Sequence, residues 1–227
     1  MAVVGWSTVR PASRTCWDGP VTLLPHDRLL FVGDSVTASG RRLPDANDLG
    51  QGYVSLVAAE LTHRRPELAL TVANRGVNGD TSPMVQARWA HDVLTWRPTV
   101  ISLLVGVNDT WRTMTSGPRL STATFEDHVR RMLAAARERF DARFVLVEPF
   151  IVPVTPSQVR WRPDLELRIA AVHRLAAEVG ATVVPADEAF TAAALDVDPA
   201  TLCADGVHPT PTGHALLART WLDAVGI

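Results

Sequence analysis

Short apolar runs alternate with longer amphipathic segments from Arg28 to the end of the chain. Apolar runs of about four to eight residues are typical of buried strands, whereas amphipathic segments longer than about ten residues are typical of helices. Their alternation predicts a parallel sheet with helices on both faces. The expected strands are 28–33, 68–76, 99–109, 143–150 and 181–186, and the expected helices are 50–65, 83–96, 124–140, 163–180, a short one from Asp187, and 214–226.

This order of elements predicts an α/β fold, with residues 28–227 forming a single three-layer domain around a five-stranded parallel sheet. The strand over 99–109 is the most apolar, so we expect it at the centre of the sheet. Residues 1–27 contain scattered proline and glycine, with Trp6 and Trp17, and show no periodicity. We interpret them as an N-terminal arm that docks through its tryptophans or serves as a partly mobile lead-in. Whether this arm joins subunits in a homo-oligomer stays open.

Charge and cysteine content exclude several classes of protein. The chain has 22 basic and 24 acidic residues, and neither sign forms a long block, so we expect no nucleic-acid partner. Cys16 and Cys203 are too few for a disulfide framework and lack the spacing of metal ligands. We expect them to remain thiols in a reducing compartment, although their pairing is left open.

The N-terminal residues do not have the pattern of a secretory signal, and no apolar stretch approaches the roughly 18 residues of a membrane span. We therefore expect a soluble, cytoplasmic protein that has no membrane partner.

Small and polar residues follow the expected strands at their carboxyl ends. In an open parallel sheet, binding and catalytic groups collect at that edge. "GDS" follows the first strand, "NRGVNGDT" the second and "GVNDTW" the third, and "DGVHPTPTGH" precedes the last helix. These four segments hold the residues that we consider for chemistry.

Ser35 of "GDS" has two interpretations. Aspartate and serine are common helix N-caps, so the segment by itself favours a turn. A nucleophilic serine also needs a base, a group that orients the base, and donors for the developing oxyanion. His208 and Asp205, three residues apart in a loop, fit the base and its orienting group, although a solvated surface turn is the alternative. Asn108 and Gly79 fit the oxyanion donors, although each is also a common turn residue.

Other catalytic arrangements are not found in the sequence. There is no G-x-S-x-G elbow, and neither a dinucleotide-binding nor a phosphate-loop fingerprint. His208 and His214 lie near Asp205, but no second cluster completes a metal site. We expect neither a metal nor another cofactor, and we assign His173 and His214 to helix faces or caps.

Together, the four segments resemble the GDSL family of esterases and lipases, in its SGNH hydrolase branch. The matching residues are Ser35 in "GDS", Gly79 in "NGDT", Asn108 in "GVND" and His208 in "DGVHP", and the blocks span residues 31–214. The resemblance implies a flavodoxin-like α/β/α fold with Ser35 as nucleophile, His208 as base and Asp205 as its orienting group. It also implies an oxyanion hole made by the Ser35 and Gly79 backbone N–H groups and the Asn108 side chain. Gly76 is the less favoured glycine, and Asp34, Asp80 and Asp109 would brace the loops.

Within the family, "FVGDSVTASGRR", "RGVNGDT" and "VGVNDTWR" look most like bacterial intracellular carbohydrate acetyl esterases, notably acetylxylan esterases. This implies a serine esterase that removes short acyl groups, above all acetyl, from a small-molecule or oligosaccharide ester such as acetylated xylo-oligosaccharide, through an acyl-enzyme. The small residues around Ser35 and the lack of a long apolar lid agree with a short acyl group. The proline-rich "HPTPTGH" departs from the family pattern and affects the expected pocket rim.

Candidate substrate contacts are Trp111, Arg112, Trp161 and Asp34. Both tryptophans are placed in loops, where an indole face stacks on a sugar; ordinary packing is the alternative. Two other functions stay open. One is a lipase or thioesterase for longer acyl chains, and the other is a non-catalytic carbohydrate-binding protein on the same fold.

Overall fold

The structure is a computed structural model that describes residues 21–43, 45–115 and 117–227. Trp6, Trp17 and Cys16, and with them most of the predicted arm, lie outside the described residues. The last residues of that arm pack against the domain. The Val21 backbone N–H donates to the Thr182 hydroxyl over 2.5 Å, and Asp27 forms a buried ion pair with Arg143.

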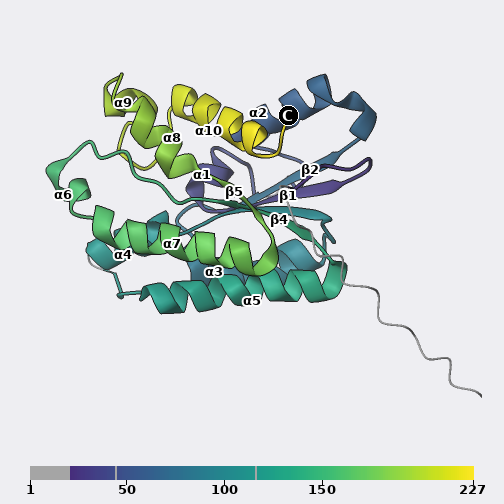
Figure 1. The fold of residues 1–227 in the computed structure, drawn as a ribbon, viewed down its shortest axis with the longest axis horizontal. Coiled ribbons are helices and arrows are strands. Elements are labelled where there is room, and N and C mark those ends of the chain that lie inside the picture. The colour runs from purple at the N-terminus through teal and green to yellow at the C-terminus, as the bar shows by residue number, and fades with distance from the viewer. Residues whose placement is uncertain (1–20, 44, 116) are drawn as a thin grey trace, which may run out of the picture.

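Five parallel strands form one sheet in the order β2-β1-β3-β4-β5 (Figure 1). This is the flavodoxin-like order, which confirms the predicted fold class and places β3 at the centre of the sheet. Gly33 of β1 pairs with Gly76 of β2 and Leu104 of β3, so these three strands end at the same level. The strands are β1 (Arg28–Gly33), β2 (Thr71–Gly76), β3 (Val100–Leu104), β4 (Arg143–Val147) and β5 (Thr182–Val184).

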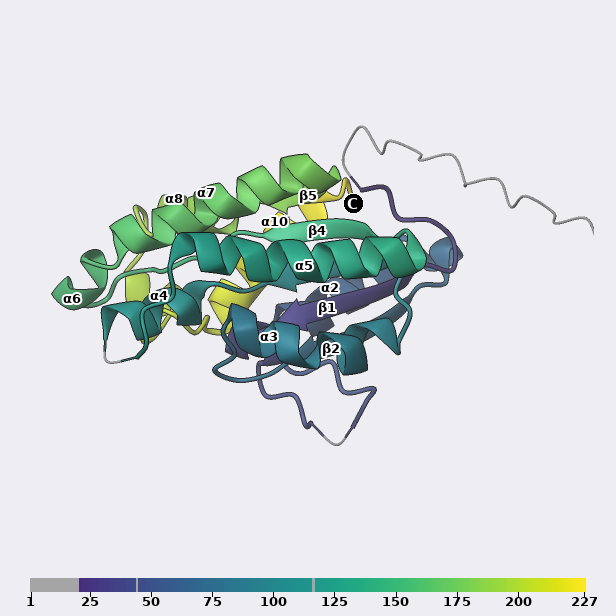
Figure 2. The same cartoon turned by 90° about the horizontal axis from the view of Figure 1, so that it is seen from below.

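Helices cover both faces of the sheet (Figures 1 and 2). One layer contains α2 (Tyr53–Arg64), α8 (Ala186–Ala193) and α10 (Pro211–Ala224). The other contains α3 (Ser82–Trp89), continued by a π-helical turn (Ala90–Leu94), together with α5 (Thr122–Phe140) and α7 (Arg162–Val179). Shorter helices lie in the connections: α1 (Ser35–Ala38) follows β1, α4 (Val107–Met114) follows β3, α6 (Pro156–Val159) lies between β4 and α7, and α9 (Pro199–Leu202) lies between α8 and α10.

Four of the five predicted strands were too long: β4 ends at Val147 and β5 covers Thr182–Val184, and β2 and β3 are also shorter than predicted. A 3₁₀ turn over Pro66–Leu68 and a left-handed Ala69 (φ 44°) precede β2, so this strand begins at Thr71. β3 ends at Leu104 because Gly106 takes φ 133° and α4 begins directly after it. The prediction of a strand over 105–109 was therefore wrong, and the residues after the central strand are helical.

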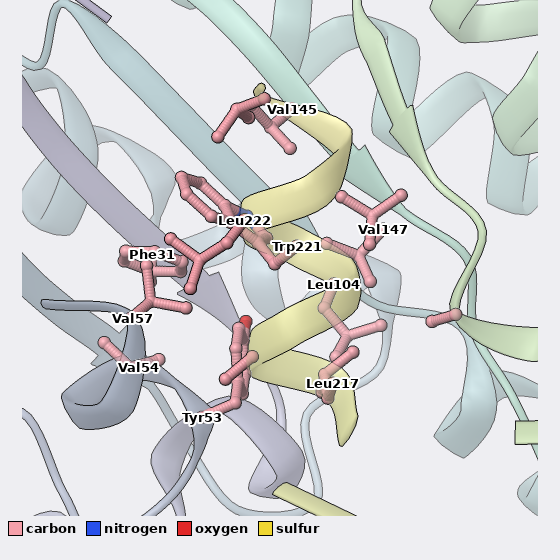
Figure 3. Close-up of a cluster of buried hydrophobic side chains, with 14 of the residues drawn as sticks. Phe31, Tyr53, Val54, Val57, Leu104, Val145, Val147, Leu217, Trp221 and Leu222 are labelled. Atoms are coloured by element: carbon pink, nitrogen blue, oxygen red, sulfur yellow. The ribbon is translucent and has the colours of Figure 1, made fainter. Parts of the chain in front are cut away.

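Alternate residues of each strand pack into two apolar clusters, one on each side of the sheet. Leu29 and Phe31 face α2 and α10, whereas Leu30 and Val32 face the layer of α3 and α5. Figure 3 shows Trp221 of α10 within the first cluster. Its ring centroid lies 5.2 Å from that of Phe31, and its indole N–H donates to Ser102 Oγ over 3.0 Å. This packing fixes α10, and with it the loop that precedes α10.

Within the described ranges, no helix combines the length and the apolar character that crossing a bilayer requires. Cys203 is a buried free thiol, and burial raises its pKa to about 12.

Candidate active site

Ser35 is the first residue of α1 and is separated from the end of β1 by Asp34 alone. Asp34 caps this helix, because its Oδ1 accepts the Val36 backbone N–H over 3.0 Å. The Ser35 side chain is half-buried and lines a pocket of about 550 Å³. "GDS" is thus a helix cap, as one interpretation held, and it also presents the serine to the pocket.

Asp34 is fully buried beneath Ser35 and does not line the pocket. Its assignment as a substrate contact was therefore wrong, because no substrate reaches a side chain enclosed by the end of the sheet. Burial raises the pKa of Asp34 to about 7, and the nearby carboxylates of Asp109 and Asp80 act in the same direction. The Val36 N–H bond opposes the shift. Among the described residues, Asp34 Oδ2 has no hydrogen-bond partner.

The burial of Asp34 predicts that the protein loses stability as the pH rises, and that Asp34→Asn abolishes this loss. Because the pKa rises from 3.8 to about 7 on folding, the stabilisation is fully present below pH 4 and is lost as pH rises through 7. We expect the difference in the free energy of unfolding, variant minus wild type, to increase from pH 4 to pH 8, by on the order of 4 kcal/mol at pH 8. Asparagine keeps the cap. Urea denaturation at several pH values measures the difference, and parallel curves for the two proteins would contradict it.

A matched control replaces an exposed aspartate on the far end of α10, Asp223→Asn, which we expect to leave the pH dependence unchanged. The buried His214 contributes with the opposite sign, because burial and then the charge of His208 lower its pKa to about 4. Its contribution is present above pH 6.5 and is lost as pH falls through 4. Taking the difference between wild type and variant removes this term.

Asp205 and His208 lie in the loop between α9 and α10. Asp205 Oδ1 accepts the backbone N–H groups of Val207 over 3.0 Å and His208 over 2.8 Å, so the aspartate closes a tight turn on itself. Its Oδ2 lies 2.6 Å from His208 Nδ1. Burial raises the pKa of Asp205, but the bonds from His208 and Val207 outweigh it, and the net effect is a lowered pKa.

The His208 ring joins Asp205 to Ser35. His208 Nε2 lies 2.8 Å from Ser35 Oγ, and the three side chains form one continuous line of hydrogen bonds. An ionised carboxylate only accepts, so Nδ1 carries the ring hydrogen and Nε2 is left to accept the Ser35 hydroxyl. The structure therefore brings together the serine, histidine and aspartate that the sequence had placed in two distant segments.

Gln158 of α6 holds this loop from outside. Its Nε2 donates to the Asp205 carbonyl over 2.6 Å, and its Oε1 accepts the backbone N–H of Val154. Gly206 takes φ 84° and packs directly against Gln158, so a side chain there would displace the glutamine. Gln158 was not predicted from the sequence. The Thr155-x-x-Gln158 spacing is that of a helix capping box, which indicates the start of α6 but not the bond to Asp205.

Gly79 and Asn108 line the pocket beside Ser35. Gly79 takes φ 78°, and a Cβ at this position would meet nothing within 4 Å, so its backbone borders open space. Asn108 is 9% exposed and donates one amide hydrogen to the Asp80 carbonyl over 3.0 Å. An amide has a second N–H. Asn108 lies in the first turn of α4 and not in a loop, which corrects its predicted setting.

Gly76 is excluded as the equivalent donor. It ends β2, its backbone N–H donates to Asn74 Oδ1 over 2.7 Å, and it packs against the backbone of α1. The two remaining aspartates brace the loops: Asp80 accepts from Arg88 Nε over 2.6 Å, and Asp109 accepts from the Ser82 hydroxyl over 2.7 Å.

The predicted substrate contacts fall into two groups. Trp111 and Arg112 line the pocket from α4, and Arg112 also donates to the Gly79 carbonyl over 3.0 Å. Trp161 does not line it. Only 7% of Trp161 is exposed, and its ring packs 5.6 Å from Trp111 within an apolar cluster. Its assignment as a sugar contact was wrong, because the Trp161 ring is buried against Trp111.

Ser39 and His214 also line the pocket, and neither was predicted to do so from the sequence. His214 lies in the first turn of α10, on its buried face, and its ring accepts the backbone N–H of Tyr53, the first residue of α2, while it also contacts Ser39 in the pocket wall. The second histidine of "HPTPTGH" was its only signal. His173 of α7, in contrast, bonds to Glu148 over 2.6 Å and does not line the pocket. Within the described residues, no group of three or more metal-ligating side chains is assembled.

Comparison with known proteins agrees with this geometry. The chain is 31% identical to an acetylxylan esterase of Geobacillus stearothermophilus over 207 residues, which cover 88% of this chain and 94% of that protein. The crystal structure of Axe2, an acetylxylan esterase from the same organism, superimposes with a TM-score of 0.84, covering 91% of this chain and 97% of the other at 30% identity. Solved variants of Axe2 described as catalytic mutants replace one serine, one aspartate and one histidine, the aspartate three positions before the histidine.

Two further structures are similar. A putative GDSL-like lipase from Parabacteroides merdae gives a TM-score of 0.83 at 31% identity, covering 91% of this chain and 99% of the other. LAE5, an alpha/beta hydrolase from the metagenome of Lake Arreo, gives 0.81 at 26% identity, covering 89% and 96%. The family model of the GDSL-like lipase/acylhydrolase family matches residues 31–216. The chain therefore belongs to this family, as its four sequence blocks indicated, and is a carboxylic ester hydrolase.

Proposed function

We propose that Ser35, His208 and Asp205 form a catalytic triad that hydrolyses short-chain acyl esters, above all acetyl esters of a carbohydrate. The observation that carries the proposal is the line of hydrogen bonds from Asp205 Oδ2 through His208 to Ser35 Oγ, at 2.6 and 2.8 Å, on the wall of a pocket. The distances are those at which a base takes a hydroxyl proton.

The reaction would proceed in two steps. Ser35 Oγ attacks the ester carbonyl while His208 Nε2 takes the hydroxyl proton, and the tetrahedral intermediate collapses to an acyl-enzyme. The alcohol leaves with the proton from His208. Water then attacks the acyl-enzyme, His208 takes a proton from that water and returns it to Ser35, and the carboxylic acid departs. Asp205 holds the ring with its hydrogen on Nδ1 and stabilises the imidazolium formed in each step.

The oxyanion of each tetrahedral intermediate would be bound by three N–H donors. Asn108 supplies the second hydrogen of its amide, whose orientation is set by the bond to the Asp80 carbonyl. The backbone N–H groups of Gly79 and Ser35 are the other two. Among the described residues neither N–H has an intramolecular acceptor, so both are available to a developing negative charge.

The pocket favours a small acyl group on a polar alcohol. Its volume of about 550 Å³ is in the range of small-molecule sites. Serine, glycine, asparagine and histidine dominate its lining, and Trp111 offers a half-buried indole face of the kind that stacks on sugar rings. The similarity to an acetylxylan esterase supports a carbohydrate substrate. Acetylated xylo-oligosaccharide is therefore the substrate that we propose.

A lipase or thioesterase for long acyl chains fits the pocket less well, because such a chain needs an extended apolar wall. Val36, Trp111 and Pro209 are the apolar residues among those that line the pocket. A non-catalytic carbohydrate-binding protein would need no line of hydrogen bonds from Asp205 to Ser35. Neither alternative is favoured by a specific contact.

The proposal predicts a steep preference for short acyl groups. We expect kcat/KM for p-nitrophenyl esters to fall by at least about tenfold from acetate to octanoate, since each added methylene lacks an apolar surface to bind. We also expect acetate to be released from acetylated xylo-oligosaccharides, measured with an enzymatic acetate assay. A rise in kcat/KM with chain length would contradict the acetyl esterase and favour the lipase or thioesterase.

A further inference from the structure

Ser39 has an unusual backbone conformation for a serine. It follows α1, its N–H donates to the Ser35 carbonyl over 2.8 Å, and its φ and ψ are 31° and 70°. This left-handed region disfavours residues with a Cβ and is most easily occupied by glycine. A helix that needed only to end here would be served better by glycine. The serine side chain is thus kept at a position where it costs stability.

The surroundings of Ser39 are built tightly around that side chain. The Gln51 backbone N–H donates to the Ser39 carbonyl over 2.7 Å. Gly52 packs so closely that a Cβ on it would lie 2.5 Å from Ser39 Cβ and 2.7 Å from His214 Cε1. Gly52 therefore leaves the room in which Ser39 and His214 meet.

The hydrogen bonds of His214 fix which of its ring atoms carries hydrogen. The Tyr53 backbone N–H points at His214 Nδ1 over 3.2 Å, so Nδ1 must accept. A neutral ring then carries its hydrogen on Nε2, which lies 2.9 Å from Ser39 Oγ and donates to it. Burial, followed by the charge of His208, lowers the pKa of His214 to about 4 and keeps the ring neutral.

As a consequence, the Ser39 hydroxyl can act only as a hydrogen-bond donor toward a ligand. Ser39 Oγ accepts from His214, and its own hydrogen has no acceptor among the described residues. Because Ser39 lines the pocket, this O–H is available to a bound ligand as a donor. Histidine thus fixes the serine as a donor and does not compete for its hydrogen.

We propose that the Ser39 hydroxyl, oriented by His214, determines specificity by donating a hydrogen bond to an oxygen of the alcohol part of the ester. The carbonyl oxygen already has its donors in Gly79, Asn108 and the Ser35 N–H, and an acetyl group has no other polar atom. A further donor in the pocket therefore serves the alcohol. That this alcohol is a carbohydrate rests on the proposed function; that it bears an oxygen acceptor is the new inference.

The test compares two acetates of similar size, a mono-O-acetylated methyl xyloside and cyclohexyl acetate. Both place a six-membered ring behind the ester, but only the xyloside carries ring and hydroxyl oxygens. We expect wild type to prefer the xyloside and Ser39→Ala to lose about tenfold in kcat/KM on it, with less than about twofold change on cyclohexyl acetate. Ser39→Gly should show the same selective loss together with a higher Tm, because it relieves the left-handed strain.

Ser55→Ala is the matched control. Ser55 lies on α2, its hydroxyl donates to the Gly52 carbonyl over 2.8 Å, and it does not line the pocket. We expect it to leave the ratio of the two kcat/KM values unchanged. A structural role for Ser39 would instead lower both rates together.

Equal kcat/KM for the two acetates in wild type, or an equal loss on both in Ser39→Ala, would overturn the inference. The proposed function fails by a different result, the absence of acetate release from xylo-oligosaccharides. A preference for the xyloside that depends on Ser39 would uphold the inference even then, since it requires only an oxygen-bearing alcohol.

Discussion

Replacement of Ser35 by alanine is expected to lower kcat for p-nitrophenyl acetate by at least about 10⁴-fold. The variant lacks the only oxygen that lies 2.8 Å from His208 Nε2 among the described residues, so no acyl-enzyme can form. The residual rate would come from water activated by His208 beside the intact oxyanion donors. Steady-state kinetics, with labelling by a serine-directed fluorophosphonate, measure the two consequences independently.

The fold should survive this substitution, because Asp34 and not Ser35 supplies the cap of α1. We expect the Tm of Ser35→Ala to stay within about 2 °C of wild type, since a half-buried hydroxyl facing a pocket adds little to packing. Ser55→Ala, which removes a hydroxyl outside the pocket, should keep full activity and labelling. Hydrolysis by Ser35→Ala at the wild-type rate would refute the triad, and labelling of that variant would point to another nucleophile.

The sequence was informative wherever chemistry depends on strand order. Ser35, Gly79 and Asn108 follow three strands whose carboxyl ends share one edge, so a correct sheet was enough to bring them together. His208 and Asp205 needed more, because they lie on a loop before α10. The three-residue spacing that suggested a paired carboxylate and imidazole fits the observed turn, in which Asp205 accepts the backbone N–H of His208 with one oxygen and contacts the His208 ring with the other.

The remainder of the site depends on packing that spacing does not encode. α4 was missed because the apolar run of β3 continues into Val105 and Val107, and only the φ of Gly106 separates strand from helix. Trp161 was misplaced because indole rings suit both sugar stacking and cores, and burial against Trp111 decides between them. Asp34 was misplaced for a similar reason, since a sequence that indicates a helix cap does not show whether the capping side chain is buried or exposed.

His214 shows the same limit most clearly. Its ring is joined to Tyr53 and Ser39, residues 161 and 175 positions away in the chain, and only the tertiary structure brings them together. Periodicity placed it correctly at the start of α10 but could not indicate that this ring lines the pocket. Pocket-lining residues that act through such long-range pairs are therefore the part of a site that a single sequence describes least.

The oxyanion site predicts the second large loss of activity. Asn108→Ala removes an amide that is oriented by its hydrogen bond to the Asp80 carbonyl. Only 9% of the surface of Asn108 is exposed. A fixed donor in a partly dry site is worth more than one in water, because it needs no reorganisation as charge develops on the carbonyl oxygen. We therefore expect kcat to fall by about 10²- to 10³-fold while KM changes little, since the donor acts mainly in the transition state.

The experiment separates this effect from a loss of structure. Asn47→Ala, on an exposed loop away from the pocket, is the matched truncation and should retain wild-type kcat. Asn108→Asp keeps the shape but replaces the N–H donor with a carboxylate beside the oxyanion, and we expect it to lose at least as much as alanine. If both Asn108 variants fold and retain more than about a tenth of wild-type kcat, the amide is not an oxyanion donor. Stabilisation of the intermediate would then fall to the two backbone N–H groups of Ser35 and Gly79.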